Sequence, residues 1–171
     1  MTIEIIEGSI TKLDVDAIVN AANATLAGGG GVDGAIHKAA GPELKAACLS
    51  FPQLRSGVRC EVGEAKVTPG FLLPARYVIH TVGPFWSGGE ANEPELLARC
   101  YRSALAEVTR LGLSSVAFPA ISTGAFGYPA LEAAKIAVRE ARAHPELRVV
   151  FSCLGVAMVR QYERALATRG P

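Results

Sequence analysis

The residues best suited to chemistry lie in one stretch of the chain, residues 17–41. It contains two asparagines, Asn20 and Asn23, then four consecutive glycines at 28–31 and the acid Asp33. A strand, a glycine loop and a helix N-terminus in this order can form an anion pocket. Glycine lets backbone amides approach a phosphate, and the helix end offers unpaired N–H groups. A carboxylate beside phosphates weakens binding, so Asp33 indicates a chemical role.

Each of these side chains also has a structural interpretation. The position of Asp33 alone favours two roles equally, a cap of its helix and a catalytic group. His37 follows it by four residues, so both share one helix face, and His37 can orient the carboxylate or be a structural histidine. We expect Asn20 to bond backbone at the end of its strand and Asn23 to contact a ligand.

A second loop of small residues, 122–129, follows another predicted strand at 115–121. Ligands of parallel α/β sheets bind at the carboxyl ends of the strands, so the two loops can clamp one phosphorylated ligand from opposite sides. Residues 29–34 formally match the dinucleotide fingerprint G-x-G-x-x-G. That interpretation is rejected because residues 20–27 separate the match from its strand and no acid ends a second strand about 20 residues later.

The surrounding pattern predicts an α/β fold. Strands and helices alternate through the second half, which favours a mostly parallel sheet with helices on both faces. A chain of 171 residues is expected to form one domain, residues 1–171. Strands are expected at 2–7 (near an edge), 17–21, 63–70, 77–82, 115–121 and 148–154, and helices at 34–40, 42–49, 94–111, 130–143 and 158–167.

Composition excludes several classes of protein. Half of the residues are hydrophobic and 19% are charged, which indicates a globular chain. The net charge is +1 without a basic block, which argues against electrostatic capture of nucleic acid or of an anionic membrane. No signal pattern opens the chain and no apolar run reaches the roughly 18 residues of a membrane helix. We therefore expect a cytoplasmic protein.

The remaining chemically capable residues favour structural roles. Four scattered cysteines without a CxxC pair argue against a zinc site or a disulfide framework and predict reduced, half-buried thiols. No Cys–His pairing is evident, which disfavours a thiol hydrolase. His80 lies in the predicted core strand and is expected to be structural. Trp86, in the polar loop 83–92, fits a lid or an exposed anchor equally.

Four segments of the sequence together resemble a known family. The chain has NAAN at 20–23, GGGGVDGAIHKAAG at 28–41, KVTPGFLLPARYVIHTVGP at 66–84 and FPAISTGAFGYP at 118–129. This combination resembles the macrodomain family, in particular its MacroD-type ADP-ribosyl hydrolases, from about Glu7 to Leu154. The resemblance implies a three-layer α/β/α sandwich with a mixed, mostly parallel sheet that binds ADP-ribose. No metal and no organic cofactor are expected.

The resemblance also implies roles for single residues. Asn23 would contact the distal ribose, Asp33 would lie near the scissile ester, and His37 would support Asp33, which makes these three the catalytic candidates. The two loops would hold the diphosphate and cover the ribose. The implied ligand-binding residues are Ser9, Ile10, Ala22, Gly30, Gly31, Val32, Ser122, Thr123, Gly124, Ala125 and Phe126.

Two positions depart from the family pattern. Ser9 stands where the family usually has an aspartate that accepts a hydrogen bond from the adenine amino group. We therefore expect weaker or water-mediated recognition of adenine, while the amide of Ile10 can still read the base. Phe126 stands where many relatives have tyrosine, so a mechanism that needs this hydroxyl does not apply here.

The predicted function is a hydrolase that removes mono-ADP-ribose from acidic side chains of proteins and deacetylates O-acetyl-ADP-ribose. Its expected partners are ADP-ribose, ADP-ribosylated proteins and O-acetyl-ADP-ribose. One alternative is a reader module that binds ADP-ribose without cleaving it. Another is a phosphatase acting on ADP-ribose 1″-phosphate, and a third is an RNA-associated regulator, which the missing basic patch disfavours.

Overall fold

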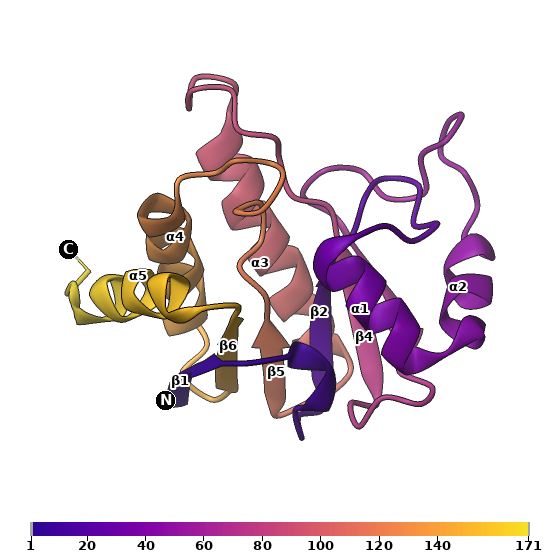
Figure 1. Cartoon of the computed structure of the whole chain (residues 1–171), viewed down its shortest axis with the longest axis horizontal. Coiled ribbons are helices and arrows are strands. Elements are labelled where there is room, and N and C mark those ends of the chain that lie inside the picture. The colour runs from indigo at the N-terminus through magenta and orange to yellow at the C-terminus, as the bar shows by residue number, and fades with distance from the viewer. Residues whose placement is uncertain (1, 171) are drawn as a thin grey trace.

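The computed structural model describes residues 2–170, which form a six-stranded sheet with helices on both faces (Figure 1). The strand order is β1-β6-β5-β2-β4-β3, and only β3 runs antiparallel to its neighbour. The first strand lies at one edge, as predicted. The strands are β1 (Thr2–Glu7), β2 (Ala17–Ala21), β3 (Ala65–Pro69), β4 (Tyr77–Thr81), β5 (Ser115–Phe118) and β6 (Arg148–Cys153).

Two helical layers enclose the sheet, which confirms the predicted α/β/α sandwich. One apolar cluster joins one face of the sheet to α3, α4 and α5, and a second joins the other face to α1 and α2. The alternation of β2 shows the division, because Val19 packs in the first cluster and Ile18 in the second. The helices are α1 (Gly31–Ala40), α2 (Pro42–Leu49), α3 (Glu93–Arg110), α4 (Ala130–Arg142), α5 (Val156–Ala167) and the short 3₁₀ helix η1 (Ile10–Lys12).

The predicted elements are all present, but some boundaries are wrong. Helix α1 begins at Gly31 instead of residue 34, since the last glycine of the loop already belongs to its first turn and Gly34 N–H donates to the Gly30 carbonyl at 3.1 Å. Strand β5 ends at Phe118, three residues early, because Pro119 has no N–H for the sheet.

The cysteines fit the prediction of reduced thiols. Cys48, Cys60, Cys100 and Cys153 are free and lie in the core, more deeply buried than expected. Within residues 2–170, no helix is long and apolar enough to cross a membrane.

Candidate functional site

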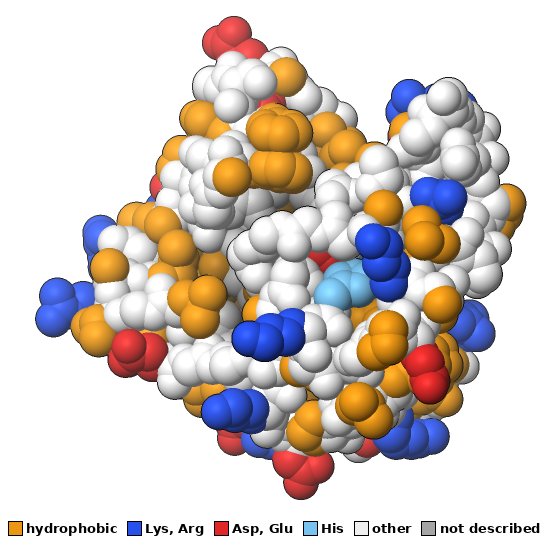
Figure 2. Space-filling view, turned by 45° about the vertical axis from the view of Figure 1, so that its right-hand side comes forward, with side chains coloured by type: hydrophobic (Ala, Val, Ile, Leu, Met, Phe, Trp, Pro, Cys, Tyr) orange, Lys and Arg blue, Asp and Glu red, His pale blue; other side chains and the backbone are white. Residues whose placement is uncertain are grey.

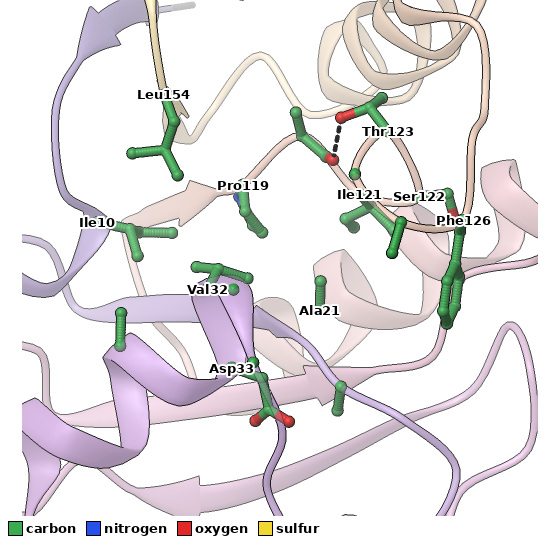
Figure 3. Close-up of a pocket in the computed structure, with 18 of the residues that line it drawn as sticks. Ile10, Ala21, Val32, Asp33, Pro119, Ile121, Ser122, Thr123, Phe126 and Leu154 are labelled. Atoms are coloured by element: carbon green, nitrogen blue, oxygen red, sulfur yellow. Dashed lines mark hydrogen bonds between the residues drawn. The ribbon is translucent and has the colours of Figure 1, made fainter.

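One cleft of about 660 Å³ lies where the five parallel strands end. Its lining comes from the segments that follow β1, β2, β4 and β5, from the end of β6 and from helices α1 and α5. Figure 3 shows Ile10 and Leu154 at one end of the cleft and Phe126 at the other, with Val32 and Ala21 between them. Figure 2 shows an acidic side chain beside a histidine in a recess of the surface.

The cleft contains almost every predicted site residue. Of the predicted set, His37 alone is outside the lining, and it contacts Asp33. The sequence missed several lining residues that are small or apolar and carry no chemical signal of their own. These are Gly8, Ala21, Gly29, Ala35, Gly83, Pro119, Ala120, Ile121, Ser152, Leu154 and Met158.

Backbone amides are the anion donors that this cleft offers. Among residues 2–170, Asp33 has the only charged side chain in the lining, and no lysine or arginine of this range contributes. The N–H groups of residues 31–33 lie in the first turn of α1 and have no intrahelical acceptor. Across the cleft, the N–H groups of residues 124–126 donate to no other group within residues 2–170. Two sets of amides without acceptors, both in residues that line one cleft, suit a diphosphate.

Glycines let the first loop, which is the glycine loop before α1, pack tightly against that helix. A Cβ on Gly34 would lie 2.7 Å from the Gly29 carbonyl oxygen, and one on Gly29 would lie 3.0 Å from Oδ2 of Asp33. Asn23 holds the same loop, because its Nδ2 donates to the Gly28 carbonyl at 2.9 Å and its Oδ1 accepts from Thr25. Asn23 thus orders the loop, while one of its amide hydrogens stays available at the cleft wall.

The carboxylate of Asp33 is held from one side. It is 5% exposed, lies in the first turn of α1 and makes no capping hydrogen bond; the helix cap is Gly30. Oδ1 accepts from Nδ2 of Asn20 at 2.8 Å and lies 3.3 Å from Nε2 of His37. Oδ2 accepts no hydrogen bond from any described residue. The capping interpretation is therefore wrong, and one carboxylate oxygen remains available.

Asn20 does not bond backbone at its strand end, contrary to prediction. It is fully buried, and its Nδ2 contacts both Asp33 and Nδ1 of His80, the latter at 3.1 Å. One feature of the sequence did indicate where the Asn20 side chain points, namely the two-residue alternation of β2. It places Asn20 on the same face as Ile18, which packs with the α1 residue Ile36.

His80 is buried in the core, as expected for its strand, and it forms a Cys–His contact that the sequence did not reveal. Nε2 of His80 lies 2.9 Å from Oγ1 of Thr68 and 3.7 Å from the thiol of Cys48. Burial, with a smaller effect of His37, lowers the pKa of His80 to about 3. Burial and the charge of Asp33 raise the pKa of the Cys48 thiol to about 11. Both groups are neutral, so this pair lacks the thiolate of a cysteine hydrolase.

The second loop is shaped by one unusual residue. Ser122 has a positive φ of 66°, which side chains other than glycine rarely adopt. Its carbonyl accepts from the Tyr128 amide at 2.9 Å, while its buried hydroxyl has no partner among residues 2–170. A Cβ at Gly83 would overlap this hydroxyl. The loop after β4 therefore requires glycine at position 83, where it meets the loop after β5.

Trp86 anchors the loop between β4 and α3 to the second cleft loop. Its backbone N–H donates to the Phe126 carbonyl at 2.9 Å, and its ring packs on that of Tyr128 with centroids 4.7 Å apart. Glu93 orders the same loop by accepting from the amides of Ser87, Gly89 and Ala91. The Ser87 amide, with smaller contributions from the others, lowers the pKa of that carboxyl. Trp86 is half-buried and not the exposed anchor of the prediction, although these contacts do fasten its loop to the second cleft loop.

Ser9 begins the short helix η1 at the far end of the cleft. Its Oγ accepts from the Thr11 amide at 3.3 Å and lies 2.7 Å from Oγ1 of Thr11. Ile10 and Leu154 provide apolar surface on either side of this end (Figure 3). The arrangement suits a flat, largely apolar group such as a base.

The family model of the Macro domain matches residues 19–137. The chain belongs to the macrodomain family. A protein of Salmonella gallinarum named O-acetyl-ADP-ribose deacetylase is 51% identical to this macrodomain over 174 aligned residues, which cover 98% of this chain and 96% of the relative.

Solved structures agree with this membership. The Oceanobacillus iheyensis macrodomain with ADP superposes with a TM-score of 0.89 at 46% identity, covering 96% of this chain and 89% of the other. The Trypanosoma brucei macrodomain in complex with ADP-ribose gives a TM-score of 0.87 at 42% identity, covering 96% of this chain and 69% of the other.

Proposed function

We propose that this macrodomain binds ADP-ribose in the cleft and hydrolyses esters of its distal ribose. The substrates are O-acetyl-ADP-ribose and proteins that carry mono-ADP-ribose on acidic side chains. The observation that supports this proposal best is the carboxylate of Asp33, which among residues 2–170 is the only charged side chain in a cleft otherwise lined by backbone, apolar and uncharged polar groups. A binding module gains nothing from a negative charge beside a diphosphate, whereas a hydrolase needs a base.

The ligand would span the cleft from Leu154 to Phe126. Its diphosphate would lie between the free amides of the two loops, and its base would lie between Ile10 and Leu154. The distal ribose would then lie near Asn23 and Asp33, under the ring of Phe126. Related macrodomains that were solved with ADP and with ADP-ribose support this choice of ligand.

Asp33 would act as the general base. Its Oδ1 is occupied by Asn20 and His37, which leaves Oδ2 for a water molecule. The carboxylate takes a proton as the water oxygen attacks the ester carbonyl carbon. When the bond between that carbon and the ribose oxygen breaks, the proton passes to the ribose oxygen. A positioned base of this type contributes about 10²–10⁴ in rate.

The deciding experiment is a time course of ADP-ribose release. Wild type, Asp33→Ala and Asp33→Asn are compared on O-acetyl-ADP-ribose and on a protein mono-ADP-ribosylated on glutamate. Asp33→Asn keeps an acceptor for Asn20, so it removes the base with little change of shape. We expect release by wild type, a loss of about 10²–10⁴ in both variants, and ADP-ribose affinity that is unchanged or higher.

Other outcomes would contradict the proposal. Binding of ADP-ribose without release by wild type would make the protein a reader. Release from O-acetyl-ADP-ribose alone would restrict the function to deacetylation. Inorganic phosphate released from ADP-ribose 1″-phosphate in preference to both esters would identify a phosphatase.

A further inference from the structure

Three buried side chains from three different elements form a row behind the cleft. Asp33 of α1 accepts from Asn20 of β2, and Asn20 contacts His80 of β4, at 2.8 and 3.1 Å. Their exposed fractions are 5%, 0% and 1%. The row begins at the cleft wall and ends on the sheet face beneath α2, where Nε2 of His80 lies 2.9 Å from Oγ1 of Thr68 in β3.

The direction of every hydrogen bond in this row is determined by chemistry. A carboxylate can only accept, so Asn20 must turn its NH₂ group towards Asp33. The same nitrogen faces Nδ1 of His80, which therefore accepts the second hydrogen of the amide. In a neutral imidazole the proton then belongs on Nε2, where it is donated to Oγ1 of Thr68.

This arrangement requires a neutral ring. A protonated imidazole has two donors, and its Nδ1–H would oppose the N–H of Asn20. Deep burial lowers the pKa of His80 to about 3, so the ring stays neutral near neutral pH. His80 thus offers Asn20 one permanent acceptor, and both hydrogens of the Asn20 amide are fixed.

We propose that His80 is a positioning residue which, through the side-chain amide of Asn20, fixes the orientation of the Asp33 carboxylate. An amide anchored at Asp33 alone could rotate about its side-chain bonds and carry the carboxylate with it. With its second hydrogen held by a buried ring between the sheet and α2, the amide directs Oδ1 inwards and keeps Oδ2 at the cleft. The catalytic consequence rests on the proposed function, whereas the structural relationship does not.

The kinetic test compares His80→Leu, His80→Gln and Val78→Ala. Leucine removes the acceptor for Asn20, whereas the glutamine carbonyl can accept from Asn20 and its NH₂ can donate to Thr68. Val78 lies on the same strand, fully buried outside the row, so Val78→Ala reports the effect of lost core packing alone. The measurements are kcat and KM on O-acetyl-ADP-ribose, ADP-ribose affinity by calorimetry, and Tm.

For His80→Leu we expect kcat to fall about ten- to a hundredfold, the scale of a misplaced catalytic group, with KM and affinity within about twofold of wild type. His80→Gln should recover most of kcat, and Val78→Ala should lower Tm without lowering kcat. Full kcat in His80→Leu, failure of glutamine to restore it, or an equal loss in Val78→Ala would overturn the proposal. If His80→Leu does not fold, Thr68→Val replaces it, with a smaller loss of kcat expected at the same KM.

A spectroscopic test is independent of activity. Nitrogen NMR of wild type should show His80 protonated on Nε2 only, throughout the range of about pH 5 to 9 that brackets the usual imidazole pKa. The side-chain NH₂ resonances of Asn20 should move in His80→Leu or Thr68→Val and return towards wild-type positions in His80→Gln. An Nδ1-protonated ring, or Asn20 resonances that do not respond, would refute the arrangement. An inactive wild type would contradict only the proposed function.

Discussion

The ring of Phe85 stacks on that of Phe126, with centroids 3.8 Å apart and planes inclined by 26°. Phe126 lines the cleft, whereas Phe85 is 65% exposed and belongs to the loop that Trp86 fastens to the Phe126 backbone. The second loop therefore holds Phe126 in the cleft lining with the ring of Phe85 stacked on it. This stack restrains the ring of Phe126, the residue that we propose covers the distal ribose.

The stack predicts the effect of Phe85→Ala. An aromatic pair contributes about 0.5–1.5 kcal/mol beyond the area it buries, so losing it should weaken ADP-ribose binding about two- to tenfold. Calorimetry measures the affinity. Leu72→Ala is the matched control, because Leu72 is 78% exposed and lies outside the cleft lining. Equal affinities for wild type and Phe85→Ala would show that Phe126 needs no support.

The first loop is best tested at Gly30. Its φ is −97° and an added Cβ would meet open space, whereas Gly31 has a φ of +57° that strains any side chain. Gly30→Glu places a negative charge against the free amides of α1, and we expect ADP-ribose affinity to fall at least about a hundredfold with little change in Tm. Gly30→Ala is the control and should bind nearly as well as wild type. Full affinity in Gly30→Glu would mean that the diphosphate lies elsewhere.

The sequence predicted the order of elements, the two loops and most of the cleft. Asp33 and His37 were correctly paired because helical spacing alone brings residues four apart together. The row behind Asp33 could not be predicted, since it joins Asn20, His80 and Thr68 from three strands whose register is set by tertiary packing. The distances between such groups depend on how α1 crosses the sheet, which no local pattern encodes.

Ser9 provides a test of base recognition. An aspartate at this position can still cap η1, since aspartate is a preferred capping residue, and it adds a charged acceptor beside the apolar end of the cleft. We expect Ser9→Asp to bind ADP-ribose tighter by one hydrogen bond, about 0.5–1.5 kcal/mol. The analogue with hypoxanthine in place of adenine lacks the amino group and should gain nothing. Equal or weaker binding of ADP-ribose would show that residue 9 does not face the base.

His80 predicts how stability depends on pH. Burial lowers its pKa to about 3, against roughly 6.5 for an exposed imidazole. Between these values the unfolded chain binds a proton that the folded chain does not, so the free energy of unfolding falls as the pH is lowered through 6.5 towards 3. From pH 7 to pH 5 the contribution of His80 to the free energy of unfolding should fall by about 2 kcal/mol.

Urea unfolding of wild type and His80→Gln at both pH values isolates this contribution, because glutamine does not titrate. If both proteins lost the same stability, His80 would not be the group that resists protonation in the fold. The proposal that a neutral His80 ring accepts a hydrogen bond from Asn20 would then be unsupported.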